Sequence, residues 1–285
     1  MKNFYIITNK EKDPDYSFTR EIMNFLRNLG MKCDCQDMSE DVTYTKYRYT
    51  NADLIASDVE CVIVLGGDGT LIQAARDLHM RNIPLLGVNI GTLGFLTDIE
   101  KDNLYTALAS VIRGDYEYDA RMMLKGEVYR NGELIYENTA LNDITINRNG
   151  ILRVIDFDVF VNNEYLNSYS ADGVIVSTAT GSTAYSLSAG GPIVQPNAEI
   201  LMITPICPHT LNKRSIVLGA DNTIEIIMSD NKRLEEERVA SFDGELFCKV
   251  ITGDRLVITR LDNKVRLIKT SKQSFLQILR KKMND

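Results

Sequence analysis

The residue types best suited to chemistry in this chain form a short turn, Gly66-Gly67-Asp68-Gly69-Thr70. The turn follows the apolar stretch 61–65, so its glycines allow a strand to turn tightly into a helix whose first N–H groups face an anion. No lysine follows Asp68 in the turn. Because a carboxylate repels a bare phosphate, we expect Asp68 to hold a metal ion or to take a proton from a hydroxyl beside that phosphate. Both roles indicate phosphoryl transfer without a Walker-type lysine, and the alternative is a simple helix cap.

Three further segments carry side chains suited to ligand binding. Residues 87–96 are rich in glycine and offer Phe95 for stacking on a flat ring, although an ordinary loop with Phe95 in the core explains them equally well. Asn142 and Asp143 place an amide beside a carboxylate, which suits either a ribose diol or a solvated turn. The run 171–192 combines small residues with many hydroxyl groups, which suits a backbone close to a sugar and phosphates. A flexible linker is the alternative for this run, which lacks the Walker A sequence.

An alternating pattern of strands and helices surrounds the glycine turn and must position it. We expect strands at 4–8, 59–65 and 83–88, and helices at 17–29, 70–79 and 102–114. The strand before the turn is apolar throughout, as in a parallel sheet covered on both faces. This order predicts an α/β domain whose ligands bind at the carboxyl ends of the strands.

From about residue 120 the pattern changes to short alternating strands joined by hairpins. Asn131-Gly132, Asn162-Asn163 and Asp243-Gly244 each separate two such strands, and Asn-Gly and Asp-Gly are strong hairpin signals. We therefore predict an α/β domain over residues 1–118 and a β-rich domain over residues 119–268. Residues 269–285 contain a tail helix that is expected to return to the first domain. A membrane-surface helix is the alternative for this basic tail.

Composition excludes several classes of function. The 285 residues carry a net charge of -7, so we expect no general nucleic-acid binding, which needs a basic surface. No apolar run approaches the ~18 residues of a membrane span, and the N-terminus is too short in apolar residues for a signal peptide. We therefore expect a cytoplasmic protein that does not bind membranes. The cysteines and histidines lack zinc-ligand spacing, so we expect reduced thiols and assign no residue as a metal ligand.

Taken together, these segments resemble the bacterial ATP-NAD kinase family. The run 172–192 is highly specific for it, whereas diacylglycerol-type lipid kinases and phosphofructokinases carry close relatives of the glycine turn. The resemblance implies an N-terminal α/β domain, a β-rich C-terminal domain, NAD bound between them, and a homodimer or homotetramer. The matching segments extend over about two thirds of the chain and are residues 66–70, 89–98, 121–124, 140–143, 172–192 and 205–211.

The resemblance also implies a reaction and a set of site residues. The reaction is transfer of the γ-phosphoryl group of ATP to the 2′-hydroxyl of the adenosine ribose of NAD, which gives NADP. Asp68 would be the base for that hydroxyl, and Mg²⁺ or another divalent cation would accompany ATP. Asn142 and Asp143 would contact NAD hydroxyls or adenine, with Asp172 toward the nicotinamide end. The other residues implied to line the dinucleotide site are Gly69, Ile72, Phe95, Thr180, Thr183, Ala184, Tyr185 and Ser188.

The sequence departs from the family pattern at a few positions and leaves two other functions open. Asp143 stands where many members have Glu, and Ala179 and Ser215 replace frequent prolines, yet we expect function to survive. The first alternative is a lipid kinase that shares the glycine turn, and the second is a catalytically silent NADP-sensing protein. The residues do not distinguish ATP from polyphosphate, NAD from NADH, or a dimer from a tetramer, and they say nothing of feedback by NADP(H).

Overall fold

The computed structural model describes residues 1–36, 50–91, 94–97, 99–150, 154–210, 213–229, 237–271 and 273–284. The chain divides into two compact units. The first unit comprises Met1–Ala120 and Asn263–Asp285, and the second unit comprises Arg121–Asp262. The sequence patterns assign residues up to 268 to the β-rich domain, whereas in the structure residues 263–268 lie in the first unit.

The first unit is built on a sheet that contains seven strands among the described residues. The strand order is β2-β1-β3-β4-β19-β6, and β5 pairs with β4. The pairs that join β1, β2, β3, β4, β5 and β19 are parallel. The strands are β1 (Asn3–Thr8), β2 (Lys32–Cys35), β3 (Cys61–Gly66), β4 (Leu85–Asn89), β5 (Ile99–Glu100), β6 (Glu117–Arg121) and β19 (Val265–Lys269).

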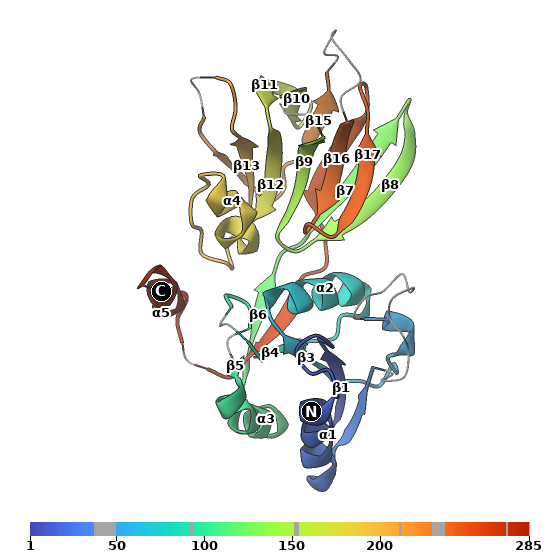
Figure 1. Cartoon of the computed structure of the whole chain (residues 1–285), viewed down its shortest axis with the longest axis vertical. Coiled ribbons are helices and arrows are strands. Elements are labelled where there is room, and N and C mark those ends of the chain that lie inside the picture. Colours follow the sequence, from blue (N-terminus) through green and yellow to red (C-terminus); the bar gives the residue numbers. More distant parts are fainter. Residues whose placement is uncertain are drawn as a thin grey trace. The chain divides into compact units, whose positions relative to one another are not determined.

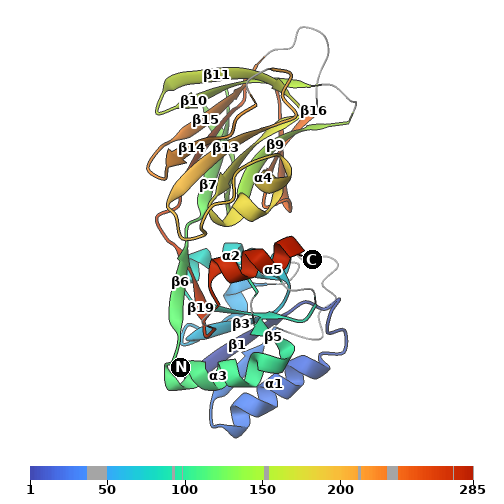
Figure 2. The ribbon, with the colours of Figure 1, turned by 90° about the vertical axis from the view of Figure 1, so that its left-hand side faces the viewer.

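Helices cover both faces of this sheet, as Figures 1 and 2 show. The α-helices are α1 (Ser17–Asn28), α2 (Asp68–Leu78), α3 (Leu104–Arg113) and α5 (Phe275–Asn284), and the short 3-10 helices are η2 (Ala52–Leu54), η3 (His79–Arg81) and η4 (Lys101–Asn103). On one face, Ile22 of α1 and Leu108 of α3 share a buried core with Ile63 of β3. Helix α2 lies on the opposite face (Figure 2). The α/β architecture predicted for this part of the chain is therefore confirmed.

The tail helix belongs to the first unit, as predicted. Helix α5 buries Ile278, and the Lys281 ammonium lies 3.3 Å from a carboxylate oxygen of Glu100. No α-helix in the described part of the chain is both long and apolar enough to cross a membrane.

Strands β3 and β4 place the glycine turn at the carboxyl ends of the parallel strands. Every residue of both strands is buried, which agrees with a parallel sheet covered by helices on both faces. The register pairs Gly66, the last residue of β3, with Asn89, the last residue of β4. The Ile90 N–H also donates to the Gly66 carbonyl at 3.1 Å. The glycine turn and the loop after β4 therefore leave the sheet side by side, where parallel sheets bind ligands.

The second unit consists of two antiparallel sheets that share one core. One sheet has the strand order β11-β10-β15-β18-β7-β8, and the other has the order β14-β13-β12-β9-β16-β17. Phe157 of the first sheet and Val176 of the second belong to the same cluster of buried residues, as in a β-sandwich. The strands are β7 (Leu124–Arg130), β8 (Glu133–Ala140), β9 (Asp143–Asn149), β10 (Ile155–Val161), β11 (Glu164–Ala171), β12 (Gly173–Thr178), β13 (Ile200–Ile206), β14 (Ile216–Gly219), β15 (Ile224–Met228), β16 (Glu237–Phe242), β17 (Leu246–Val250) and β18 (Arg255–Arg260).

All three predicted hairpins are present in this unit. Each turn uses backbone with positive φ, which suits the right-handed twist of the strands that it joins. The φ angles are 52° and 83° at Asn131 and Gly132, 50° and 66° at Asn162 and Asn163, and 50° and 70° at Asp243 and Gly244.

The hydroxyl-rich run is folded, so the flexible-linker alternative is wrong. It forms strand β12, the 3-10 helix η5 (Thr180–Thr183) and the short helix α4 (Tyr185–Ser188). All residues of β12 are buried. A β-carbon added to Gly181 would lie 2.2 Å from the Asn142 carbonyl oxygen, so η5 packs directly against the Asn142 backbone.

Candidate functional site

Asp68 is the first residue of helix α2, but it does not cap it. The N-cap position is occupied by Gly67 and has no side-chain cap, so the helix-cap alternative is wrong. The Asp68 carboxylate instead reaches the loop after β4. Its Oδ2 accepts the Phe95 N–H at 2.7 Å, and its Oδ1 accepts the N–H groups of Leu96 and Thr97 at 3.1 and 3.0 Å. The Thr97 hydroxyl donates to Oδ1 at 3.0 Å.

These contacts give Asp68 a structural role and leave it able to act as a base. Each carboxylate oxygen offers about two lone pairs. Oδ1 is saturated by three donors, whereas Oδ2 has a single donor from the described residues and keeps acceptor capacity. The fit is close, since a β-carbon on Gly94 would lie 1.9 Å from Oδ1. Asp68 thus fixes residues 94–97 while one of its oxygens can still take a proton.

The other site residues predicted in the first unit lie around the same turn. Gly69 is exposed on the first turn of α2, and Ile72 is half-buried one turn further. Phe95 is also half-buried, and the Lys282 ammonium lies 5.8 Å from the centre of its ring. Stacking of Phe95 on a ligand ring stays a prediction. Thr92, Leu93 and Asp98 of the matching segment lie outside the described residues.

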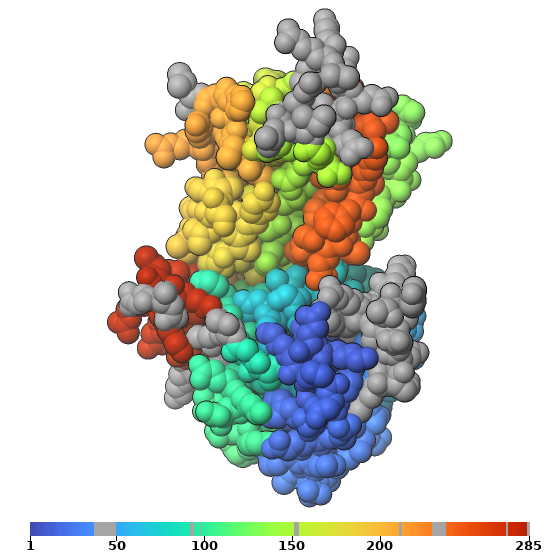
Figure 3. Space-filling view, in the orientation of Figure 1, coloured from blue at the N-terminus to red at the C-terminus, as the bar shows by residue number. Residues whose placement is uncertain are grey.

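The second unit contains an open cavity of about 750 Å³. Its wall is formed by β9, β16, β17 and the start of α4, and Figure 3 shows β9 (green) between α4 (yellow) and β17 (orange). The described residues that line it are Asn142, Asp143, Thr145, Asn147, Arg148, Asn149, Ala184, Tyr185, Val239, Ser241, Asp243, Gly244 and Phe247. We call this space the polar cavity. Four predicted site residues therefore lie together on its wall, namely Asn142, Asp143, Ala184 and Tyr185.

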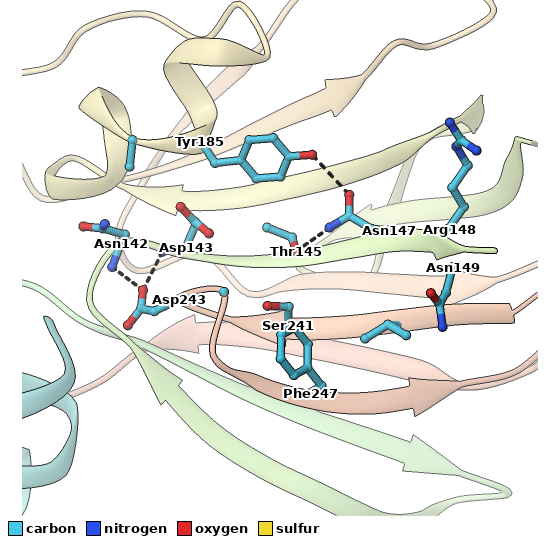
Figure 4. Close-up of a pocket in the computed structure, with 13 residues that line it drawn as sticks. Asn142, Asp143, Thr145, Asn147, Arg148, Asn149, Tyr185, Ser241, Asp243 and Phe247 are labelled. Atoms are coloured by element: carbon cyan, nitrogen blue, oxygen red, sulfur yellow. Dashed lines mark hydrogen bonds between the residues drawn. The ribbon is translucent and has the colours of Figure 1, made fainter. Parts of the chain in front are cut away.

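The backbone of Asn142 and Asp143 is held by Asp243, a residue from the β16–β17 turn. Asp243 Oδ1 accepts the N–H groups of Asn142 and Asp143 at 2.8 and 3.2 Å, and Oδ2 accepts the Leu141 N–H at 2.8 Å. The Asp243 N–H in turn donates to the Asp143 carbonyl at 3.0 Å. Figure 4 shows this carboxylate below the two residues that it holds. The turn is therefore ordered and mostly buried rather than merely solvated.

The Asp143 carboxyl group faces the polar cavity without a donor from the described residues. Only 5% of the residue is exposed, and no described residue donates a hydrogen bond to its side chain. Burial, followed by the charge of the neighbouring Asp243 carboxylate, raises the pKa of Asp143 from 3.8 to about 7. A ligand hydroxyl or amine would supply the missing hydrogen bond.

Two aromatic rings stand on opposite sides of strand β9 in the cavity (Figure 4). Tyr185 of α4 is 43% exposed, and Phe247 of β17 is 59% exposed. The Tyr185 hydroxyl donates to Asn147 Oδ1 at 3.5 Å, and the Asn147 amide donates to the Thr145 hydroxyl at 2.8 Å. Burial, followed by the Asp143 carboxylate, raises the pKa of Tyr185 above its usual value. Exposed rings beside hydrogen-bonding groups suit a flat heterocycle attached to a sugar.

Four predicted residues of the second unit are not among the described residues that line the cavity. Asp172 pairs with Arg148, which does line it, at 2.7 Å. Thr180 is buried, and its hydroxyl accepts a 3.3 Å hydrogen bond from Arg121. Thr183 donates to the Thr180 carbonyl at 3.4 Å, and Ser188 is exposed at the end of α4. The roles assigned to these residues stay predictions.

Several residues of the cavity escape prediction from the sequence. The Asp243-Gly244 pair signals a hairpin, but nothing in the local sequence shows that its carboxylate binds a loop about 100 residues earlier. Thr145, Asn147 and Asn149 alternate with Ile144, Ile146 and Arg148 on β9, so the strand period could have placed these three on one face of the strand with Asp143. No cluster of three or more His, Cys, Asp or Glu residues suited to a metal ion occurs in the described part of the chain.

Comparison with known proteins agrees with the fold described above. Residues 7–116 match the model of the ATP-NAD kinase N-terminal domain, and residues 141–270 match that of the ATP-NAD kinase C-terminal domain. Two solved structures share the fold over all of this chain. A yeast NADH kinase complexed with NADH has a TM-score of 0.78 at 21% identity over 88% of that chain. An Archaeoglobus fulgidus NAD kinase in complex with ATP has a TM-score of 0.74 at 22% identity over 99% of that chain.

The fold and the site thus define a two-domain protein with the NAD kinase architecture. Sequence relatives narrow this further. An NAD kinase from Lachnospira eligens is 57% identical over 99% of this chain and 100% of its own length. An NAD kinase from Geobacter sp. (strain M21) is 46% identical over 99% of this chain and 98% of its own length. The chain belongs to the ATP-NAD kinase family.

Proposed function

We propose that the protein is an NAD kinase that transfers the γ-phosphoryl group of ATP to the 2′-hydroxyl of the adenosine ribose of NAD and releases NADP and ADP. The observation that carries this proposal is the polar cavity, where Asn142, the donor-free Asp143 carboxyl group and the Tyr185 ring lie together. These groups suit the hydroxyls and flat base of a dinucleotide. Family membership supplies the reaction, since the relatives reported above are named NAD kinase.

The dinucleotide is held mainly by hydrogen bonds in this proposal. Asn142 and Asp143 bind NAD hydroxyls or the adenine amine, and Tyr185 and Ala184 contact the dinucleotide from α4. Asp172, with its partner Arg148, lies toward the nicotinamide end. The remaining residues proposed to line the dinucleotide site are Gly69, Ile72, Phe95, Thr180, Thr183 and Ser188.

Asp68 supplies the base in this mechanism. The 2′-hydroxyl oxygen attacks the γ-phosphorus, and the bond from that phosphorus to the β–γ bridging oxygen breaks, so ADP leaves. The hydroxyl proton passes to Asp68 Oδ2, the oxygen with spare acceptor capacity. Most of the remaining catalysis comes from positioning and from charge stabilisation.

An ATP-using kinase family implies a divalent cation, and we propose that this ion is Mg²⁺. The described residues contain no carboxylate cluster that would hold a resident ion, which fits an ion that arrives with ATP as part of the substrate. When bound, the ion neutralises charge on the phosphate oxygens.

The lipid kinase and the NADP sensor receive no support from the relatives. Cellular location and oligomeric state are further proposals. The relatives reported above are named NAD kinase, which gives no support to a diacylglycerol-type kinase. A silent NADP sensor needs no base, although Asp68 would still hold residues 95–97 in it, so turnover is what separates the sensor from the enzyme. We also propose a cytoplasmic location, because all five cysteines are unpaired, and a homodimer or homotetramer, which light scattering will test.

The decisive assay mixes purified protein, ATP, Mg²⁺ and NAD and follows NADP with an NADP-specific dehydrogenase. We expect NADP to accumulate, and EDTA to stop its formation. In parallel reactions, polyphosphate replaces ATP, NADH replaces NAD, and diacylglycerol replaces NAD. Formation of phosphatidic acid without NADP would favour the lipid kinase. Tight binding of NADP without turnover would favour the sensor.

A further inference from the structure

A lysine ammonium lies over the glycine turn although the turn itself contains no lysine. A β-carbon added to Gly67 would lie 3.2 Å from Lys12 Nζ, and one added to Gly91 would lie 2.7 Å from it. Gly67 follows β3 and Gly91 follows β4, which are neighbouring strands. The ammonium therefore spans the two glycine-containing loops that leave the sheet side by side. A side chain at either position would displace the ammonium from its present place.

The loop that carries Lys12 is anchored at both ends. Asn9 donates its backbone N–H to the Leu65 carbonyl at 2.8 Å and its side-chain amide to the Thr70 hydroxyl at 3.1 Å. The Lys12 N–H donates back to the Asn9 carbonyl at 3.0 Å. On the other side, Asp13 accepts the Phe18 and Thr19 N–H groups at the start of α1, at 3.2 and 2.9 Å. The backbone of Lys12 is thus fixed relative to the glycine turn.

The Lys12 ammonium has no partner among the residues that the structure describes. No hydrogen bond, ion pair or cation–π contact joins its side chain to another of these residues. Beneath it, the first N–H groups of α2 have no acceptor within the helix, because a helix leaves its first turn unpaired. A cation and free N–H donors around a tight glycine turn can together bind phosphate oxygens.

We propose that Lys12 is a positioning residue that binds the terminal phosphates of ATP over the glycine turn. It takes the place of the lysine that Walker-type loops carry within the turn itself. This inference rests on the proposed kinase function and adds to it a residue that holds ATP, the phosphoryl donor. The ammonium neutralises the charge that the neighbouring Asp68 carboxylate would otherwise repel, so the phosphate and the base can share one turn.

The test compares Lys12→Met, Lys12→Arg and the matched control Lys10→Met, which removes an exposed lysine from the same loop. Initial rates of NADP formation are measured against ATP at saturating NAD, and against NAD at saturating ATP. We expect Lys12→Met to raise the KM for ATP by about tenfold or more, the usual scale for a lost charge-assisted hydrogen bond. The KM for NAD should change less than about twofold, and Lys12→Arg should recover most of the loss.

Melting curves of all variants identify a purely structural role. If Lys12 only stabilises the loop, Lys12→Met lowers the melting temperature and affects both substrates alike. Equal KM values for ATP in wild type, Lys12→Met and Lys10→Met would overturn the inference about Lys12. The proposed kinase function would still stand in that case, because the wild-type protein forms NADP. A wild-type protein that forms no NADP would instead refute the proposed function, and then binding of Mg·ATP by calorimetry tests Lys12 directly. Unchanged Mg·ATP affinity in Lys12→Met would overturn the inference there as well.

Discussion

Asp143 combines two features that rarely occur together in a surface cavity. Its carboxyl group is almost fully buried, and no described residue donates a hydrogen bond to it. The Asp243 carboxylate beside it is occupied by three backbone N–H groups. In the free protein, no hydrogen bond from a described residue stabilises the charged form of Asp143, so its pKa rises to about 7. Bound NAD would provide the compensating donors.

We predict that Asp143→Asn raises the melting temperature of the free protein at pH 8. Since the folded-state pKa of about 7 lies above the ordinary 3.8, wild-type stability falls as the pH rises from about 4 to about 7 and is level above that. The amide cannot ionise and avoids this loss, which is at most about 4 kcal/mol at pH 8. Melting curves from pH 4 to pH 8 check this. A gain that does not shrink toward pH 4 would contradict the assignment.

At the scale of single residues, the sequence indicates chemistry better than it indicates contacts. Asp68, Asn142 and Asp143 stand out because their types and neighbours suit phosphoryl transfer and sugar binding. Asp243 and Lys12 do not, because their partners are distant in the sequence and are reached only after the sheets form. Long-range pairing is a property of the fold, which a local pattern does not contain.

Among the elements, the β16–β17 hairpin has two tasks. Its turn reverses the chain with positive φ at Asp243 and Gly244. The Asp243 carboxylate also fixes the backbone of Asn142 and Asp143 at the start of β9. Loss of the carboxylate leaves three N–H groups without their acceptor. Each such group costs about 1–3 kcal/mol when it stays buried.

We predict that Asp243→Ala weakens NAD binding by about tenfold or more, because the Asn142–Asp143 backbone loses its anchor. Asn131→Ala is the matched control, since Asn131 occupies the same positive-φ position in the β7–β8 hairpin. Both variants lose some stability from the strained backbone. Calorimetric titration with NAD should find a change only for Asp243→Ala. Similar NAD affinities for the two variants would remove Asp243 from the binding site.

Elements with a strong local pattern are predicted well, and short strands are not. The buried strand before the glycine turn, helices α1 to α3 and the three hairpins follow from apolar spacing and turn residues. Strand β19 has a similar alternating pattern to the β-rich domain, yet it pairs with β4 in the first sheet. The sequence of a strand indicates that it is half-buried, but the sheet that it joins depends on the path of the chain.

For the whole molecule, the residues proposed for binding and for chemistry come from both units. The polar cavity lies in the second unit, whereas Asp68 and Lys12 lie in the first. Ligands that bind only the folded state stabilise it by mass action. We predict that NAD at 100 times its Kd adds about 2.7 kcal/mol to the free energy of unfolding, and that dispersed diacylglycerol adds nothing. Thermal melts with each ligand decide this, and stabilisation by the lipid alone would contradict the dinucleotide assignment.

The most direct test of the account is steady-state NADP formation by Asp68→Asn. The amide oxygen can keep the hydrogen bonds made by Oδ1, whereas its NH2 group, in place of Oδ2, loses the Phe95 bond together with the proton acceptor. We predict that kcat falls by about 100-fold or more while NAD affinity changes little. Thr97→Val is the control for loop disturbance, because it removes one hydrogen bond to Asp68 and keeps the carboxylate. Its kcat should stay within a few-fold of wild type. A folded Asp68→Asn protein with near wild-type kcat would contradict the central claim that Asp68 is the base of an NAD kinase.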